Sequence, residues 1–210
     1  MEWWFIRHGY TAWNLTRRYQ GHSNPGLLPG AEAGLDRLPG ELAGIRFRAV
    51  YCSDLLRCRE TLARVRPELA SEARYDFRLR EMNFGDWEGQ TYEQLKDIPA
   101  YRSWIDDPAL CPPPGGESWE QFENRVTGFF KELKTGIAPL SSEGGYSSPS
   151  DSVLIITHGG VISLLAGKLA SGRQFHDPAF KIAPGEVLRL QVQLSEGGFE
   201  LLPNLPREAE

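Results

Sequence analysis

Residues 153–169 read VLIITHGGVISLLAGKL, and this stretch decides the fold class. Its first five residues form an apolar run with the length of a buried strand, and the run ends at His158, which two glycines follow. The residues from Val161 to Leu169 are again mostly apolar, which predicts a buried helix. A strand, a tight turn and a helix in succession are the building block of a parallel sheet. The sequence therefore predicts an α/β fold.

Further elements are expected on both sides of this stretch. Short apolar runs bounded by glycine or polar residues predict additional strands, and a period-two alternation followed by Ser195-Glu-Gly-Gly198 predicts a β-hairpin near the end of the chain. The expected elements are strands over 2–6, 49–53 and 75–79, a helix over 55–65, and a hairpin with strands 187–194 and 199–202.

Between residues 82 and 152 the strand pattern gives way to a helical one. Ser118 and Gln121 have the spacing of a capping box, and apolar residues then recur on one face, which predicts a helix over 118–135. Residues 137–152 are rich in Ser, Gly and Pro and predict an exposed loop. We therefore expect one domain over residues 1–210. It would be a three-layer α/β/α sandwich with a mostly parallel central sheet and a helical insertion at about 82–152.

The composition excludes several classes of protein. The chain has 210 residues, of which 40% are hydrophobic, and its 23 Lys and Arg against 28 Asp and Glu give a net charge of −5. An acidic chain without a Lys/Arg tract is not expected to bind nucleic acid or an anionic membrane. It shows no secretory signal and no apolar stretch of the ~18 residues that a membrane span requires, and its cysteines form no C-x-x-C. We expect a cytoplasmic protein, and the composition leaves open whether it forms a homodimer.

Two histidines directly follow predicted strands, and each precedes a glycine. His8 and His158 thus stand at carboxyl ends of strands, where open parallel sheets bind their ligands. Arg7 adjoins the first histidine, Arg57 lies in the turn after another strand, and Glu81 follows the predicted strand 75–79. Arginines and histidines around one point suit a phosphoryl group, because a guanidinium binds phosphate oxygens bidentately. Each of these residues alone is also typical of a structural position, and only the combination favours a site.

Other conspicuous residues are predicted to be structural. Trp3, Trp4 and the apolar face of 118–135 are expected in the hydrophobic core. Asp86 and Glu88, which come shortly after Glu81, are expected to be exposed acids of a turn.

Six ordered blocks of the sequence resemble the histidine phosphatase superfamily, to which the cofactor-dependent phosphoglycerate mutases belong. The blocks are 7–14 (RHGYTAWN), 18–21 (RYQG), 53–57 (SDLLR) with Thr61, 79–89 (LREMNFGDWEG), 115–118 (GGES) and 157–160 (THGG). The fourth and fifth blocks resemble those of α-ribazole phosphatases and related broad-specificity phosphatases. The sequence lacks the longer insertion with a Trp-Arg-Arg stretch that the mutases carry.

The resemblance implies a reaction and a role for each candidate residue. His8 would be the nucleophile that forms a phosphohistidine, and nearby arginines would lower its pKa and keep the ring neutral. Glu81 would protonate the leaving oxygen, and Arg7, Arg57 and His158 would hold the phosphoryl group. The resemblance also implies four residues that line the substrate pocket, which are Asn14, Gln20, Gly21 and Gly159.

We therefore expect a phosphomonoesterase that acts on a small phosphorylated metabolite without a cofactor. No metal is expected, because the two arginines supply positive charge and the His/Cys spacing gives no zinc motif. The resemblance points to α-ribazole 5′-phosphate, an intermediate of cobalamin biosynthesis, or to a broad range of phosphomonoesters. The alternatives are a phosphoglycerate mutase, a non-catalytic, phosphate-binding regulatory module and a metal-dependent phosphatase.

Overall fold

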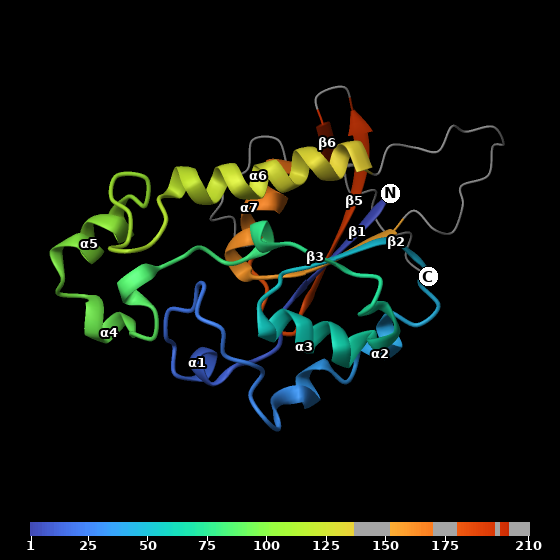
Figure 1. Cartoon of the computed structure of the whole chain (residues 1–210), viewed down its shortest axis with the longest axis horizontal. Coiled ribbons are helices and arrows are strands. Elements are labelled where there is room, and N and C mark those ends of the chain that lie inside the picture. Colours follow the sequence, from blue (N-terminus) through green and yellow to red (C-terminus); the bar gives the residue numbers. More distant parts are fainter. Residues whose placement is uncertain (137–151, 170–179, 196–197, 202–210) are drawn as a thin grey trace, which may run out of the picture.

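The protein is described by a computed structural model that covers residues 1–136, 152–169, 180–195 and 198–201 (Figure 1). The described strands are β1 (Glu2–Arg7), β2 (Phe47–Cys52), β3 (Arg74–Tyr75), β4 (Ser152–Thr157), β5 (Val187–Ser195) and β6 (Gly198–Leu201). They form one sheet in the order β3-β2-β4-β1-β5-β6. The pairs β3-β2, β2-β4 and β4-β1 are parallel, whereas β5 pairs antiparallel with β1 and with β6. The predicted mostly parallel sheet is confirmed.

Helices cover both faces of this sheet, so the protein is a three-layer α/β/α sandwich. The α-helices are α1 (Ala12–Leu15), α2 (Leu38–Glu41), α3 (Leu56–Val65), α4 (Tyr92–Leu95), α5 (Pro99–Asp106), α6 (Trp119–Gly136) and α7 (Gly159–Leu169). Figure 1 shows α6 and α7 on one side of the sheet and α2 and α3 on the other, with α4 and α5 at the left of the view. In the part of the chain that the structure describes, no helix is both long and apolar enough to cross a membrane.

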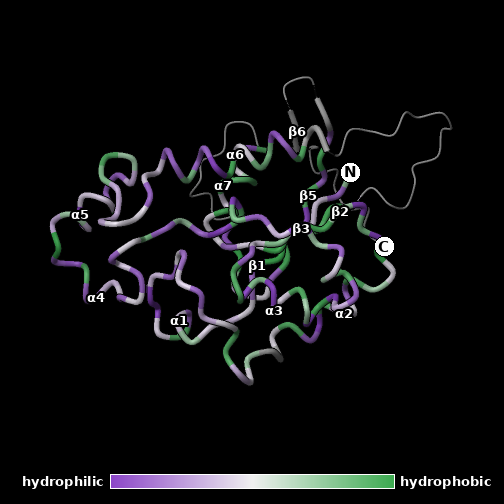
Figure 2. The backbone as a smooth tube through the Cα atoms, viewed as in Figure 1, coloured by the Kyte–Doolittle hydropathy of each residue, from purple (hydrophilic) through white to green (hydrophobic). Residues whose placement is uncertain are grey.

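The alternation of side chains along β1 divides the hydrophobic core into two parts, because successive residues of a strand face opposite sides of its sheet. Trp3 and Phe5 belong to the cluster that contains α6 and α7 residues, and Trp4 and Ile6 belong to the cluster that contains α2 and α3 residues. Trp3 is 0% exposed and Trp4 4%, which confirms that both lie in the core. Figure 2 shows hydrophobic residues concentrated along these central strands.

The predicted elements are present with small shifts, except for one strand. The helix expected over 118–135 is α6, and its capping box is formed by Ser118 N donating to Gln121 Oε1 (2.8 Å) and Gln121 N donating to Ser118 Oγ (3.1 Å). The strand expected over 75–79 is wrong. Only Arg74–Tyr75 is strand, and Phe77–Leu79 is a 3₁₀ helix because the Asp76 side chain accepts a hydrogen bond from Arg78 N (2.8 Å) and caps a turn there.

Within the described residues, further 3₁₀ helices connect the main elements at Ala31–Leu35, Pro67–Leu69 and Gly85–Trp87. The loop expected over 137–152 falls outside the described residues except for Ser152, which begins β4. The two strands of the predicted hairpin are β5 and β6, and residues 196 and 197 between them lie outside the described residues.

The register of the central strands brings their carboxyl ends to one level. Arg7 of β1 pairs with Thr157 of β4, and Cys52 of β2 pairs with Ile156 of β4. The next residues on β1, β4 and β2 are His8, His158 and Ser53, so the fold places these three side chains at one edge of the sheet.

Candidate active site

The two histidines predicted to meet do so. Their ring centroids are 5.1 Å apart at an interplanar angle of 59°. His8 is 4% exposed and His158 0%, and His8 N donates a hydrogen bond to Thr157 O (3.0 Å). The backbone of His8 is thus bonded to the last residue of β4, directly before His158.

The geometry of His8 leaves one ring nitrogen with a free lone pair. Nδ1 lies 2.8 Å from Gly9 O, and because a carbonyl only accepts, the proton is on Nδ1. Burial lowers the pKa of His8 well below its ordinary value, and the charges of Arg57 and Arg7 lower it further. His8 is thus neutral, with the lone pair on Nε2, which is the state that a nucleophilic imidazole needs.

His158 is fixed by hydrogen bonds at both ring nitrogens. Arg57 Nη2 lies 3.2 Å from Nδ1, and since a guanidinium only donates, Nδ1 is the acceptor. Nε2 then carries the proton and donates to Ser53 Oγ (2.9 Å). Burial lowers the pKa of His158 well below its ordinary value, and Arg57 lowers it further. In this arrangement His158 orients Arg57. Binding a phosphoryl oxygen through Nδ1 would require this nitrogen to release Arg57 and to carry a proton, because both atoms are otherwise acceptors.

Arg57 is fully buried and is held mainly by carbonyl oxygens. Its Nη1 donates to Ser23 O (2.8 Å) and its Nη2 to Gly21 O (2.8 Å). With the Gln20 amide oriented so that its nitrogen donates to Thr11 Oγ1 (2.7 Å), its oxygen accepts from Arg57 Nη1 and Nε (3.2 Å each). These neutral acceptors orient the guanidinium without neutralising its charge, which remains available to an anion.

Arg7 lies against the first turn of α7. Its Nη1 donates to Ile182 O (2.8 Å), whereas its Nε is buried and has no hydrogen-bond partner among the described residues. A Cβ at Gly159 would lie 3.3 Å from Arg7 Cζ, so the glycine allows the guanidinium to approach the backbone closely. The side chain therefore places an unused donor beside a helix N-terminus, and both features favour an anion.

Glu81 is brought to the same edge from outside the sheet. Its Oε1 accepts a hydrogen bond from Met82 N (3.0 Å) and its Oε2 from Gly160 N (2.9 Å), the second residue of α7. The carboxyl group of Glu81 thus lies at the turn that carries His158. The five residues predicted to carry the chemistry, Arg7, His8, Arg57, Glu81 and His158, are brought together.

The residues predicted to line the substrate pocket have different surroundings. Asn14 completes the capping box of α1 with the N-cap residue Thr11, since its Oδ1 accepts from Thr11 N (3.0 Å) and Thr11 Oγ1 (3.0 Å). Gly21 packs so tightly that a Cβ there would lie 2.2 Å from Met82 O. Gln20 and Gly21 both contact Arg57, and Gly159 contacts Arg7, whereas the Asn14 side chain serves the local fold.

Sequence reasoning missed several residues that build the site. Ser53 holds His158, and its position just after β2, equivalent to those of His8 and His158, is a signal that could have found it. Thr61 Oγ1 accepts from Gly9 N (2.9 Å), the residue after His8.

The expectation that Glu88 is an exposed acid is wrong, whereas Asp86 is exposed as expected. The Glu88 carboxylate accepts from His22 N (2.8 Å), Ser23 N (2.6 Å) and Phe84 N (3.2 Å). It therefore holds residues 21–23, whose carbonyls hold Arg57. The sequence contains no local signal for this role, because the contacts join segments distant along the chain.

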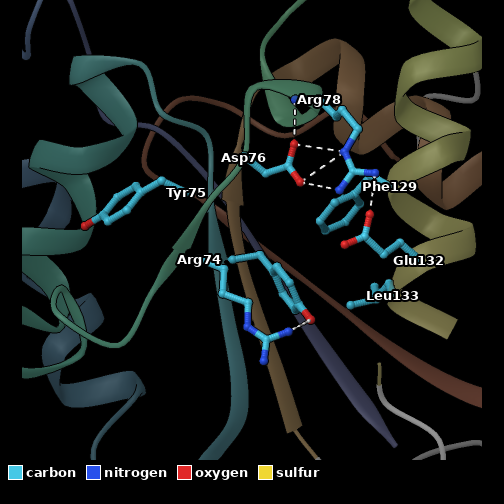
Figure 3. Close-up of a pocket in the computed structure, with 8 residues that line it drawn as sticks. Arg74, Tyr75, Asp76, Arg78, Phe129, Glu132 and Leu133 are labelled. Carbon is cyan, nitrogen blue, oxygen red and sulfur yellow. Dashed lines mark hydrogen bonds and ion pairs between the residues drawn. The ribbon is translucent and has the colours of Figure 1, made fainter. Parts of the chain in front are cut away.

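A separate cavity of about 270 Å³ lies between β3 and α6 (Figure 3). Arg78 crosses it between Asp76 and Glu132, with its guanidinium over the Phe129 ring. None of the predicted site residues lines this cavity. Within the described ranges no cluster of three or more His, Cys, Asp or Glu side chains could hold a metal ion.

Comparison with known proteins identifies the family of this chain. A family model of the histidine phosphatase superfamily (branch 1) matches residues 3–204. The chain is 33% identical over 171 residues to an adenosylcobalamin/alpha-ribazole phosphatase of Escherichia coli, a match that covers 80% of this chain and 79% of the relative. It is also 33% identical over 169 residues to a glucosyl-3-phosphoglycerate phosphatase of Mycobacterium tuberculosis, covering 78% and 73%.

Among solved structures, the alpha-ribazole phosphatase from Shigella flexneri superposes with a TM-score of 0.77 at 27% identity, covering 96% of this chain and 95% of that one. The relatives named here are phosphatases, and the resemblance seen in the six sequence blocks extends over nearly the whole chain. The chain belongs to the histidine phosphatase superfamily (branch 1) and is a hydrolase of the phosphatase type.

Proposed function

We propose that this protein is a metal-independent phosphomonoesterase that works through a phosphohistidine at His8. The observation that carries the proposal is the state of the His8 ring, which is neutral, buried and has its Nε2 lone pair free, within a group of arginine donors. A nucleophile of this kind divides one difficult displacement into two easier ones.

In the first step, His8 Nε2 attacks phosphorus in line and forms an N–P bond while the P–O bond to the leaving group breaks. Arg7 and Arg57 stabilise the charge on the phosphoryl oxygens, and Arg7 Nε is a buried donor left for that purpose. Glu81 gives its proton to the leaving oxygen, which departs as an alcohol.

In the second step, the Glu81 carboxylate takes a proton from water, which attacks phosphorus and releases inorganic phosphate and His8. Two guanidinium groups near the reacting atoms provide the positive charge that a metal ion supplies in other phosphatases. No metal is therefore required for this sequence of steps.

For the substrate we propose a small phosphorylated metabolite, with α-ribazole 5′-phosphate as the first candidate. Two proteins named alpha-ribazole phosphatase support this choice, the Escherichia coli relative by its sequence identity of 33% and the Shigella flexneri protein by the similarity of its solved structure. The glucosyl-3-phosphoglycerate phosphatase, also 33% identical, supports the wider class of phosphorylated small molecules.

The experiment is a panel of phosphomonoesters assayed with EDTA present, including α-ribazole 5′-phosphate and 3-phosphoglycerate. We expect phosphate release in EDTA, an acid-labile phosphoryl group on the wild-type protein after rapid quenching, and loss of both in His8→Ala. A His8→Ala protein with near-normal turnover would refute the assigned nucleophile. Isomerisation of 3-phosphoglycerate with 2,3-bisphosphoglycerate that is faster than phosphate release would instead identify a mutase. No turnover on any ester would identify a phosphate-binding module.

A further inference from the structure

The segment that carries Glu81 has no strand partner for much of its backbone. After β3 ends at Tyr75, the chain forms a one-turn 3₁₀ helix and then runs through residues 80–84 without a ladder of strand hydrogen bonds. Backbone carbonyls that lack such a ladder and are withdrawn from water need other donors. The groups that supply those donors therefore determine the backbone position of Glu81.

The guanidinium of Arg125 on α6 donates hydrogen bonds to three of these carbonyls. Arg125 Nη1 donates to Arg78 O (2.8 Å) and Arg80 O (2.7 Å), and Arg125 Nη2 donates to the carbonyl of Glu81 itself (2.7 Å). A guanidinium suits this role because its donors lie in a rigid planar fork, whereas the three donors of a lysine all rotate about one nitrogen. Arg125 thus fastens the backbone of Glu81 to a helix of the sandwich.

A second side chain fixes the guanidinium in turn. Glu117 forms a two-point ion pair with Arg125, through Oε1 to Nη2 (2.6 Å) and Oε2 to Nε (2.9 Å), and both side chains are only 12% exposed. The same Oε1 also accepts from Asn83 N (2.7 Å). The Arg125–Glu117 pair therefore forms hydrogen bonds with the backbone on both sides of Glu81, and Glu117 fixes the orientation of the guanidinium.

We propose that Arg125, oriented by Glu117, is a positioning residue for the Glu81 carboxyl group, and that it acts on the proton transfer to the leaving oxygen and not on the attack by His8. The inference deepens the proposed function and rests on it. The His8 and Arg57 side chains receive no hydrogen bond from Arg125 or Glu117. A loosened segment 78–83 would thus displace the acid and leave the nucleophile in place.

The role has a kinetic signature that a purely structural role lacks. A poor leaving group, such as the alkoxide of an alkyl phosphate, needs a proton from a well-placed acid, whereas p-nitrophenolate leaves almost unaided. Displacement of the acid by about 1 Å can cost about 10²-fold in rate. The loss should therefore fall on alkyl phosphates and spare p-nitrophenyl phosphate when kcat/KM is compared. This ratio reports the steps up to the phosphohistidine and leaves out the second step, in which Glu81 serves both substrates alike.

The test measures kcat/KM for glycerol phosphate and p-nitrophenyl phosphate in Arg125→Lys, Glu117→Gln and Glu81→Gln. Arg125→Lys keeps the charge near His158 but replaces the planar donors with one nitrogen. We expect it to lower kcat/KM for glycerol phosphate by about 10²-fold and that for p-nitrophenyl phosphate by less than about threefold. Glu117→Gln should show the same bias, and Glu81→Gln a larger one.

Glu123→Gln is the matched control, because Glu123 lies on α6 two residues from Arg125 and pairs with Lys168 of α7 (2.7 Å) instead. It should leave both rates within about twofold of wild type. If Glu81→Gln shows the bias but neither Arg125→Lys nor Glu117→Gln does, the positioning role is refuted. If Glu81→Gln itself shows no bias, the acid assigned in the proposed function fails, and the two failures are thereby distinguished. Circular dichroism identifies a variant that does not fold. If either Arg125→Lys or Glu117→Gln fails to fold, the kinetics of the other variant test the positioning role.

Discussion

The replacement of Gly160 by alanine tests the placement of the acid from the opposite side. Gly160 is the second residue of α7, and its N–H donates to Glu81 Oε2 (2.9 Å). A Cβ there would lie 2.2 Å from Glu81 Oε1, whereas real Cβ atoms essentially never come within 3.0 Å of a neighbour. The carboxylate must therefore retreat by at least 0.8 Å.

This retreat sets the expected magnitude. A misplacement of about 1 Å costs about 10²-fold in rate, which corresponds to about 2.7 kcal/mol in the activation free energy. The fold itself should tolerate the change, because the atom that must move is the end of a flexible side chain. Alanine also favours a helix over glycine by up to about 1 kcal/mol. Activity and stability are thus expected to change independently.

The assay compares kcat/KM for glycerol phosphate and p-nitrophenyl phosphate, together with Tm, in Gly160→Ala and Gly128→Ala. Gly128 lies inside α6, and a Cβ there would meet nothing within 4 Å, so it controls for the helix effect alone. We expect Gly160→Ala to keep its Tm and to lose about 10²-fold on glycerol phosphate, and Gly128→Ala to keep its rates. Wild-type rates on glycerol phosphate in Gly160→Ala would show that Glu81 is not the proton donor or is not held as the structure shows.

Two further predictions concern pH and Glu88. The pKa values of His8 and His158 are lowered in the folded chain, so the unfolded chain binds more protons than the folded chain as the pH falls below about 6.5. The free energy of unfolding should therefore fall on acidification, by up to about 1.4 kcal/mol per pH unit for each ring. Urea unfolding between pH 5 and 8 measures this, and a stability that rises on acidification to pH 5.5 would contradict it. In Glu88→Gln an amide NH₂ replaces one of the carboxylate oxygens that accept hydrogen bonds from His22 N and Ser23 N. The loop 21–23 that holds Arg57 should therefore loosen, and the inhibition constant for inorganic phosphate should rise about tenfold. The control is Asp86→Asn, because Asp86 is an exposed acid in the same turn. Equal inhibition constants in the two variants would show that Glu88 does not support the phosphate site.

The sequence was sufficient wherever a feature depends on neighbouring residues. The apolar runs of β1 and β4, the capping box of α6 and the alternation of β5 are all written in consecutive residues, and each was found with shifts of one or two positions. His8 and His158 could be expected at one edge, because parallel strands end at the same side of a sheet.

The failures have a different physical origin. The expected strand over 75–79 has the composition of a strand, but one hydrogen bond from Arg78 N to the Asp76 side chain turns the chain after Tyr75. Glu88 reads as a surface acid because its three donors come from residues 22, 23 and 84, which the sequence does not connect to it.

The sequence by itself indicated the strands β1, β2, β4, β5 and β6, the helices α3, α6 and α7, and the candidate residues of the site. Only the tertiary structure decided which ring nitrogen of His8 is free, which acceptors hold Arg57 and how Arg125 fastens the segment of Glu81. Hydrophobic periodicity is a property of adjacent residues, whereas the direction of a lone pair or the position of a carboxylate depends on hydrogen bonds between segments that meet only when the chain is folded.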